Sequence, residues 1–199
     1  CILQLALGNV GESGGGCNIY RGHDNVQGAT DVGPNPDSLP GYYGIATGSW
    51  KHWCGVWGVD YEWVKKQFAS QGMMEKPGIT VSRWIDAVLE KNENIDQDAN
   101  RRAVIVWGHA PNSQTRGKEM VEAMKKLDLL VVIDPYPSAT AAMAAMVRQD
   151  GVYLLPAATQ MECAGSATAS NRSIQWREKG IDPRFDSHTD HMVMNQFAG

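Results

Sequence analysis

Apolar and polar positions alternate most clearly between residues 101 and 160. Three apolar runs of strand length occupy residues 103–108 (AVIVWG), 128–134 (DLLVVID) and 151–157 (GVYLLPA), and two helix-like segments occupy residues 113–127 and 138–147 between them. Continuous apolar strands that alternate with helices are typical of a parallel sheet covered on both faces. The pattern predicts an α/β fold with a doubly wound, mostly parallel sheet and helices on both faces.

The chain divides into three regions of different composition. Residues 1–49 hold a short apolar segment and then a run rich in Gly, Pro, Asn and Asp, in which residues 31–44 (DVGPNPDSLPGYYG) exclude a regular helix or a central strand. So long a run without regular structure is typical of a functional or disordered segment. Residues 50–100 form a Trp-rich helical segment, whose tryptophans we expect to pack in a core. Residues 101–199 form the α/β portion.

Composition narrows the class of protein. A net charge of −4 and a pI of about 5.7 argue against a protein whose main ligand is nucleic acid. The sequence contains no run of eighteen apolar residues, so it predicts no membrane-spanning helix. The four cysteines are far apart, which favours free or buried thiols over a metal cluster. The chain begins without Met on an apolar, helix-like run, so we expect it to be cut from a longer protein.

Polar residues follow the first two predicted strands. In open α/β sheets, ligands bind beyond the carboxyl ends of the strands. Gly108 begins one such loop, in which Asn112 or Ser113 is placed to cap the next helix and backbone amides can face an anion. Asp134 ends the next strand, where a carboxylate can accept two donors from a ribose diol or a guanine edge. The alternative for both loops is turn chemistry alone.

Residues 14–33 (GGGCNIYRGHDNVQGATDVG) concentrate glycine and polar side chains. The Arg21 guanidinium offers a rigid donor fork for a carboxylate or another oxyanion. Gly22 beside it allows backbone to approach a bulky ligand. The alternative is an internal salt bridge from Arg21 to Asp24 or Asp31.

Two other segments each keep two interpretations. Residues 188–191 (HTDH) form either part of a metal site or a solvated helix start, and residues 162–180 (ECAGSATASNRSIQWREKG) either wrap a cofactor or form an exposed turn. The chain lacks the GxxxxGK[ST] motif, and its glycine triplet lacks the GxGxxG register after a strand. Ordinary NTP and NAD sites are therefore not predicted.

Several segments together resemble one family, in order and over essentially the whole chain. The sequence resembles the catalytic subunits of molybdenum- or tungsten-dependent formate dehydrogenases, in the molybdopterin oxidoreductase (dimethyl sulfoxide reductase) superfamily. The segments that carry the resemblance are GNVGESGGGCNIYRGHDNVQGATDVG, SLPGYYG, VWGHAPNSQT, LDLLVVIDPYPSATAAM, VYLLPAATQ and ASNRSIQWREK.

The resemblance implies an oxidoreductase that converts formate to CO2 at Mo or W held by two molybdopterin guanine dinucleotides. It implies a 4Fe-4S cluster in an N-terminal part that this sequence lacks. An iron-sulfur electron-transfer subunit and a membrane cytochrome b subunit are the implied partners, and the periplasm is the implied location. We expect this chain to be an internal piece of such a subunit, inactive by itself.

Individual positions match family segments. The resemblance implies that Arg21 and His23 are catalytic, with Arg21 holding the formate carboxylate, and that no metal ligand lies in this chain. It implies cofactor contacts for eight residues, which are Gly22, Gln27, Gly28, Gly108, Asn112, Ser113, Asp134 and Thr140. Asp24 departs from the family pattern and adds a negative charge beside an anion site. The alternatives are a nitrate or polysulfide reductase type, or a non-catalytic α/β binding module.

Overall fold

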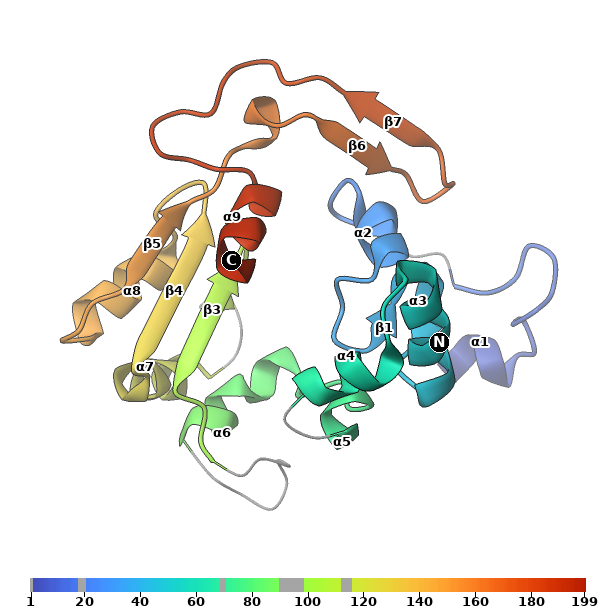
Figure 1. Cartoon of the computed structure of the whole chain (residues 1–199), viewed down its shortest axis with the longest axis horizontal. Coiled ribbons are helices and arrows are strands. Elements are labelled where there is room, and N and C mark those ends of the chain that lie inside the picture. The colour runs from blue at the N-terminus through green and yellow to red at the C-terminus, as the bar shows by residue number, and fades with distance from the viewer. Residues whose placement is uncertain (1, 18–20, 69–70, 90–98, 112–115) are drawn as a thin grey trace.

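A three-stranded parallel sheet forms the centre of the C-terminal half (Figure 1). The computed structural model describes the chain apart from residues 1, 18–20, 69–70, 90–98 and 112–115. The strands are β3 (Ala103–Trp107), β4 (Leu129–Asp134) and β5 (Tyr153–Pro156), in the order β3-β4-β5. All three correspond to the apolar runs, and the predicted α/β class is confirmed.

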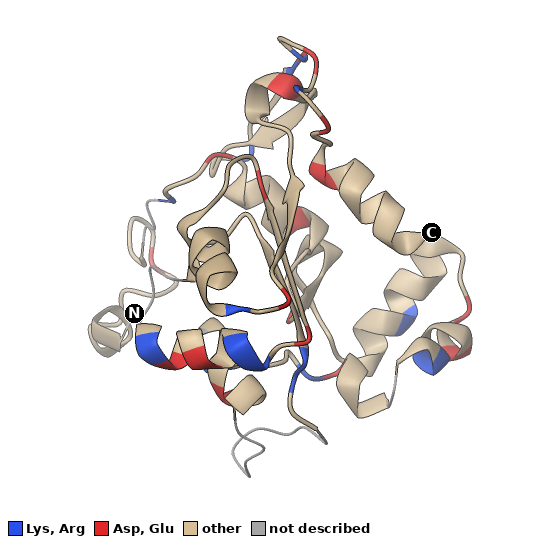
Figure 2. Cartoon of the chain, turned by 90° about the vertical axis from the view of Figure 1, so that its left-hand side faces the viewer, with Lys and Arg blue, Asp and Glu red and all other residues tan. Residues whose placement is uncertain are grey.

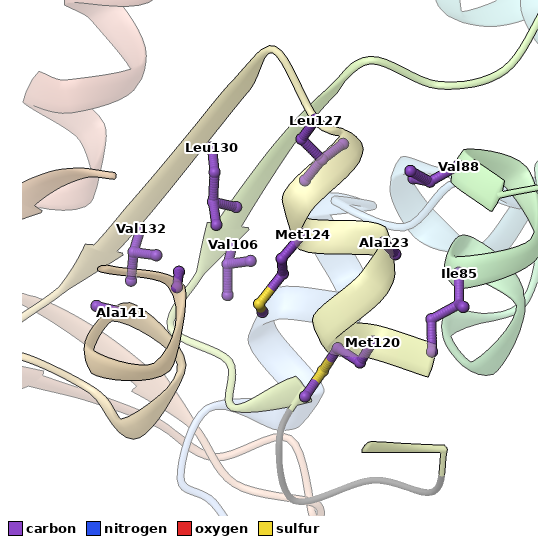
Figure 3. Close-up of a cluster of buried hydrophobic side chains, with 11 residues drawn as sticks. Ile85, Val88, Val106, Met120, Ala123, Met124, Leu127, Leu130, Val132 and Ala141 are labelled. Carbon is purple, nitrogen blue, oxygen red and sulfur yellow. The ribbon is translucent and has the colours of Figure 1, made fainter. Parts of the chain in front are cut away.

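Helices cover both faces of this sheet. On one face pack α7 (Gly117–Lys126) and α8 (Ala139–Val147), and Figure 3 shows Met120 and Met124 of α7 within the cluster that includes Val106 of β3. On the other face packs α9 (Asp190–Ala198), whose Val193 joins a cluster with Val131 and Ile133 of β4. Consecutive β4 residues point to opposite faces of the sheet, so this one strand contributes side chains to both clusters. Its apolar run is continuous because both of its faces are buried.

Helix ends in this half follow local chemistry, with one correction. The Ser138 hydroxyl accepts a hydrogen bond from the Ala141 amide and caps α8. Arg148 is buried and donates to the carbonyls of Met124 and Leu127, which belong to the end of α7. Residues 112 and 113, which the sequence offered as caps of the next helix, lie outside the described residues. The helix α7 begins at Gly117, after Arg116 in the left-handed region, and so later than the sequence predicts.

The N-terminal half is built from short helices and turns. These are α1 (Ile2–Ala6), α2 (Val26–Val32), α3 (Thr47–Trp57), α4 (Tyr61–Gln67), α5 (Gln71–Met74), η2 (Val81–Arg83) and α6 (Trp84–Leu89), with β1 (Ser38–Leu39), η1 (Pro40–Tyr42) and β2 (Tyr43–Gly44) between α2 and α3. β1 and β2 pair only with each other, so no central strand forms there, as predicted. However, α2 runs through residues 31 and 32, where the sequence excluded a helix, and ends at Gly33 with φ 75°.

Tryptophan packing is only partly as expected. Trp50 and Trp53 are half-buried, but Trp57 and Trp63 expose 47% and 57% of their surface. The expectation of a Trp-lined core is therefore wrong for these two. The described cysteines Cys17, Cys54 and Cys163 are free thiols, as expected.

An antiparallel hairpin follows the sheet and reaches over α2 (Figure 1). It consists of β6 (Gly165–Thr168) and β7 (Ile174–Arg177), preceded by the short turn η4 (Gln160–Glu162). In the view of Figure 2, acidic and basic residues are interspersed along the chain. Of the helices in the described residues, none has the length and apolar character needed to cross a membrane.

Candidate functional site

A cavity of about 240 Å³ lies between the start of α2 and the β6–β7 hairpin. One wall comes from the loop before α2 and its first turn, and the other from the hairpin. Its lining residues are Arg21, His23, Asp24, Asn25, Val26, Gln27, Ala167, Thr168, Ala169, Ser170 and Gln175. Two segments about 140 positions apart in the sequence therefore build one site.

Arg21 is exposed at the cavity, and Gln27 holds its guanidinium. Nη1 of Arg21 donates to Oε1 of Gln27 at 2.7 Å. The buried Gln27 amide donates in turn to Oδ1 of Asp31 at 2.8 Å and to the Tyr42 hydroxyl. Among the ion pairs of the described residues, none includes Arg21. The alternative of a direct salt bridge to Asp24 or Asp31 is therefore wrong.

Asn25 connects the two walls of the cavity through a hydrogen bond. Its backbone has φ 58° and ψ 14°, a left-handed conformation that Asn adopts more readily than most residues. Its Oδ1 accepts a hydrogen bond from the Thr168 amide at 2.9 Å. A Cβ on Gly28 would lie 2.2 Å from this oxygen and 2.9 Å from Oγ1 of Thr168. Gly28 therefore permits the close approach of α2 and β6.

Asp24 contacts η4, the turn that precedes the hairpin. Nε2 of Gln160 donates to Oδ1 of Asp24 at 3.2 Å, and Nη1 of Arg177 donates to Oε1 of Gln160 at 3.4 Å. The Asp24 carboxylate is thus linked through Gln160 to Arg177 of β7. His23 is exposed in the same lining, and a Cβ on Gly22 would contact nothing within 4 Å.

A buried carboxylate fixes the base of the hairpin. Glu162 accepts hydrogen bonds from the amide and hydroxyl of Thr159 at 2.7 and 2.8 Å and from the Arg184 amide at 2.9 Å. These bonds, first those from Thr159, lower the pKa of Glu162 below its ordinary value. The charged form therefore holds together the two chain segments that enter and leave the hairpin.

The remaining predicted site residues lie at the sheet and do not line the cavity. Gly108 follows β3 with φ 55°, and its amide donates to the Ile133 carbonyl at 2.9 Å. Asp134 ends β4 and accepts from the Tyr136 amide at 3.1 Å, and Thr140 is fully buried in the first turn of α8. Residues 112 and 113 lie outside the described part of the chain. The site residues thus form two groups, one at the cavity and one at the strand ends.

The HTDH segment starts a helix. The Thr189 hydroxyl accepts from the Met192 amide at 3.4 Å and caps α9. Over the residues that the structure describes, no group of three His, Cys, Asp or Glu side chains is arranged to hold a metal ion.

Sequence reasoning did not identify several residues in and around the cavity. Asn25 and Thr168 join its two walls, Gln160 contacts Asp24, and Tyr42 supports Gln27. An Asn before a short helix was the one local signal, because Asn favours both helix starts and left-handed backbone.

Comparison with known proteins gives the same assignment over the whole chain. Residues 1–199 match the family described as molybdopterin oxidoreductase. The chain is 31% identical over 199 residues to the F420-dependent formate dehydrogenase subunit alpha of Methanocaldococcus jannaschii, covering 100% of this chain and 25% of that protein. It is 30% identical over 234 residues to the formate dehydrogenase subunit alpha of Megalodesulfovibrio gigas, covering 99% and 22%.

Formate dehydrogenase H of Escherichia coli is 26% identical over 198 residues, covering 98% of this chain and 24% of that protein. The chain thus spans about a quarter of the length of the relatives it matches. The resemblance that the sequence motifs indicated is confirmed at the level of the family. The chain belongs to the molybdopterin oxidoreductase family.

Proposed function

We propose that this chain is part of the catalytic subunit of a molybdopterin-dependent formate dehydrogenase. The reaction converts formate to CO2 and releases one proton and two electrons. The family supports redox chemistry at a molybdopterin cofactor, and relatives that are named formate dehydrogenases support formate as the substrate.

The exposed guanidinium of Arg21 carries this proposal. Arg21 supplies the only Lys or Arg side chain among the residues that line the cavity, and no carboxylate of the described chain pairs with it. Formate is a planar anion, and a guanidinium can donate two parallel hydrogen bonds to its carboxylate. Such a charge-assisted contact contributes about 1.5 to 3 kcal/mol. His23 in the same lining is of the right chemical class to accept the released proton.

The polar groups of the chain fit a pterin cofactor with a nucleotide end. The cavity offers amides and hydroxyls from Asn25, Thr168, Ser170 and Gln175, which can pair with the polar edge of a pterin. Asp134 at the carboxyl end of β4 can accept the paired donors of a guanine. When bound, the molybdopterin-held Mo or W supplies the two-electron acceptor.

The finer parts of the proposal are supported by the sequence resemblance alone. They are two guanine dinucleotides for each metal, a 4Fe-4S cluster, an iron-sulfur partner subunit, a membrane cytochrome b subunit and a periplasmic location. The same holds for the cofactor contacts assigned to Gly22, Gln27, Gly28, Gly108 and Thr140. These stay predictions.

The test replaces Arg21 by Lys in the cofactor-loaded enzyme. Lysine keeps the positive charge but loses the bidentate fork, so we expect the KM for formate to rise about tenfold, equivalent to about 1.4 kcal/mol. The matched control is Arg102→Lys, at an exposed ion pair with Asp128 on the amino-end side of the sheet, which should leave the KM unchanged. Unaltered kinetics in Arg21→Lys would refute the assignment of Arg21 to the substrate.

A further inference from the structure

We propose that Gln27 is the positioning residue for Arg21, holding its guanidinium at the cavity while keeping the charge of Asp31 away from it. This inference rests on the proposed role of Arg21 toward formate. It assigns to the side-chain amide of Gln27 a function within the protein, in addition to the cofactor contact that the sequence resemblance implies for this residue.

The contacts of Gln27 occupy both ends of its side-chain amide. Oε1 accepts from Nη1 of Arg21 at 2.7 Å, and Nε2 donates to Asp31 at 2.8 Å and to the Tyr42 hydroxyl. An amide nitrogen has two hydrogens, so these two acceptors use both. The Gln27 residue is 4% exposed, although Arg21 itself is exposed. The Gln27 side chain, which is buried and whose amide hydrogens are both in hydrogen bonds, therefore holds the exposed guanidinium of Arg21.

The direction of the amide is fixed by its partners. If the amide were flipped, its nitrogen would face the donors of Arg21 and its oxygen would face the carboxylate of Asp31, which are both repulsive arrangements. One orientation alone satisfies the three groups. Gln27 thus presents a neutral acceptor to Arg21 at the same time as it binds the carboxylate of Asp31.

Tyr42 is held in an unusual backbone conformation to complete this arrangement. Its φ is 64°, in the left-handed region that a bulky residue rarely adopts, and it follows Gly41 with φ 70°. Non-glycine residues persist in this region when the surrounding structure requires it, and they concentrate at functional sites. The tyrosine whose hydroxyl accepts from Gln27 is such a residue.

A spacer is needed because Arg21 and Asp31 have opposite charges and share one neighbour. Without the amide between them, the guanidinium could turn to Asp31 and form a direct ion pair. That pair would occupy the donor fork and compensate the charge that an anionic substrate needs. Gln27 is therefore expected to matter most for substrate affinity.

The experiment uses the cofactor-loaded enzyme and a rescue design. Gln27→Met keeps the side-chain length and removes the polar atoms. We expect the KM for formate to rise about tenfold, with a smaller change in kcat, since Arg21 then pairs with Asp31. Gln27→Met combined with Asp31→Asn removes that competing carboxylate, and we expect its KM to return to within about threefold of the wild-type value.

A second measurement does not depend on turnover. Phenylglyoxal modifies arginine, and peptide mass spectrometry reports the rate at Arg21 in protein without formate. Because a direct carboxylate partner slows this modification, we expect a rate at least about threefold lower in Gln27→Met and recovery in the double variant. Urea midpoints of both variants check that the fold is retained. If Gln27→Met does not fold, Tyr42→Phe is used in its place. It removes one hydroxyl that accepts from Gln27 and should raise the KM for formate about twofold.

The outcomes separate this inference from the proposed function. If Arg21→Lys raises the KM but Gln27→Met leaves both the KM and the modification rate unchanged, the role of Gln27 is wrong and that of Arg21 stands. An equal KM rise with and without the Asp31→Asn change would also overturn the spacer role. If Arg21→Lys itself has no effect, the proposed function is wrong.

Discussion

The Asn25 side chain accepts a hydrogen bond from the Thr168 amide at 2.9 Å, across 143 positions of sequence. Asn25 directly precedes α2 and Thr168 ends β6, so this single bond joins the two walls of the cavity. The left-handed backbone of Asn25 aims the side chain there. A local conformational preference of one residue thus contributes to the assembly of a site from distant segments.

Replacing Asn25 by Ala is expected to lower the free energy of unfolding by about 2 to 3 kcal/mol. About 1 kcal/mol comes from the lost hydrogen bond and about 1 to 2 kcal/mol from an alanine in left-handed backbone. Asn25→Gly, the matched control, loses the bond without the backbone strain and should cost about 1 kcal/mol. Urea unfolding measures both. Equal losses in the two variants would show that the backbone at residue 25 relaxes.

Gly28→Ala is expected to destabilise the protein by about 1 to 3 kcal/mol, the usual cost of overpacking. The new Cβ would lie 2.2 Å from Oδ1 of Asn25 and 2.9 Å from Oγ1 of Thr168, so the side chains that join α2 to β6 must move. The matched control is Gly22→Ala, where a Cβ would meet nothing within 4 Å. Thermal unfolding compares them. A Gly28→Ala variant as stable as Gly22→Ala would contradict the close approach.

Local periodicity was enough to predict the sheet. The apolar run over residues 129–134 reflects a strand buried on both faces, and Ser138 marked the start of α8 through its capping hydroxyl. Both features depend on residues within a few positions of each other. A single sequence therefore contains the information needed to predict them.

The cavity could be predicted only in part. Arg21 was identified as an anion-binding candidate from its guanidinium and the adjacent glycine, His23 was identified through the family resemblance, and the structure places both in the cavity lining. The opposite wall lies within residues 162–180, for which the sequence left two interpretations, because contacts between α2 and β6 leave no periodic pattern in either segment. Gly28 shows the same limit: glycine was interpreted as room for a ligand, and the structure shows close packing against Thr168. Its role toward a cofactor stays a prediction.

Asp24→Asn is expected to lower the KM for formate about twofold at low ionic strength. The change removes a negative charge from the cavity wall and keeps an oxygen that can accept from Gln160. Because Asp24 is exposed, salt should screen the effect, which should vanish near 1 M ionic strength. Asp150→Asn, on the amino-end side of β5, is the control with no expected effect. A KM that rises in Asp24→Asn would show that the carboxylate assists the substrate.

Glu162→Gln is expected to reduce stability most at neutral pH and least in acid. The side-chain amide of the new glutamine has one oxygen that can accept and one NH2 group that cannot. At least one of the three hydrogen bonds that Thr159 and Arg184 donate to Glu162 is therefore lost. The folded pKa of Glu162 is lowered, so its charged form stabilises the protein above the unfolded pKa of about 4.3, and this contribution is lost as the pH falls through the folded value. In urea unfolding from pH 7 to pH 3, the difference in midpoint between wild type and variant should therefore shrink progressively once the pH falls below the unfolded pKa of about 4.3. Glu122→Gln, at an exposed ion pair with Lys125, should change the midpoint little at any pH. A difference for Glu162→Gln that stays constant over this range would mean that its carboxylate is not held in its charged form.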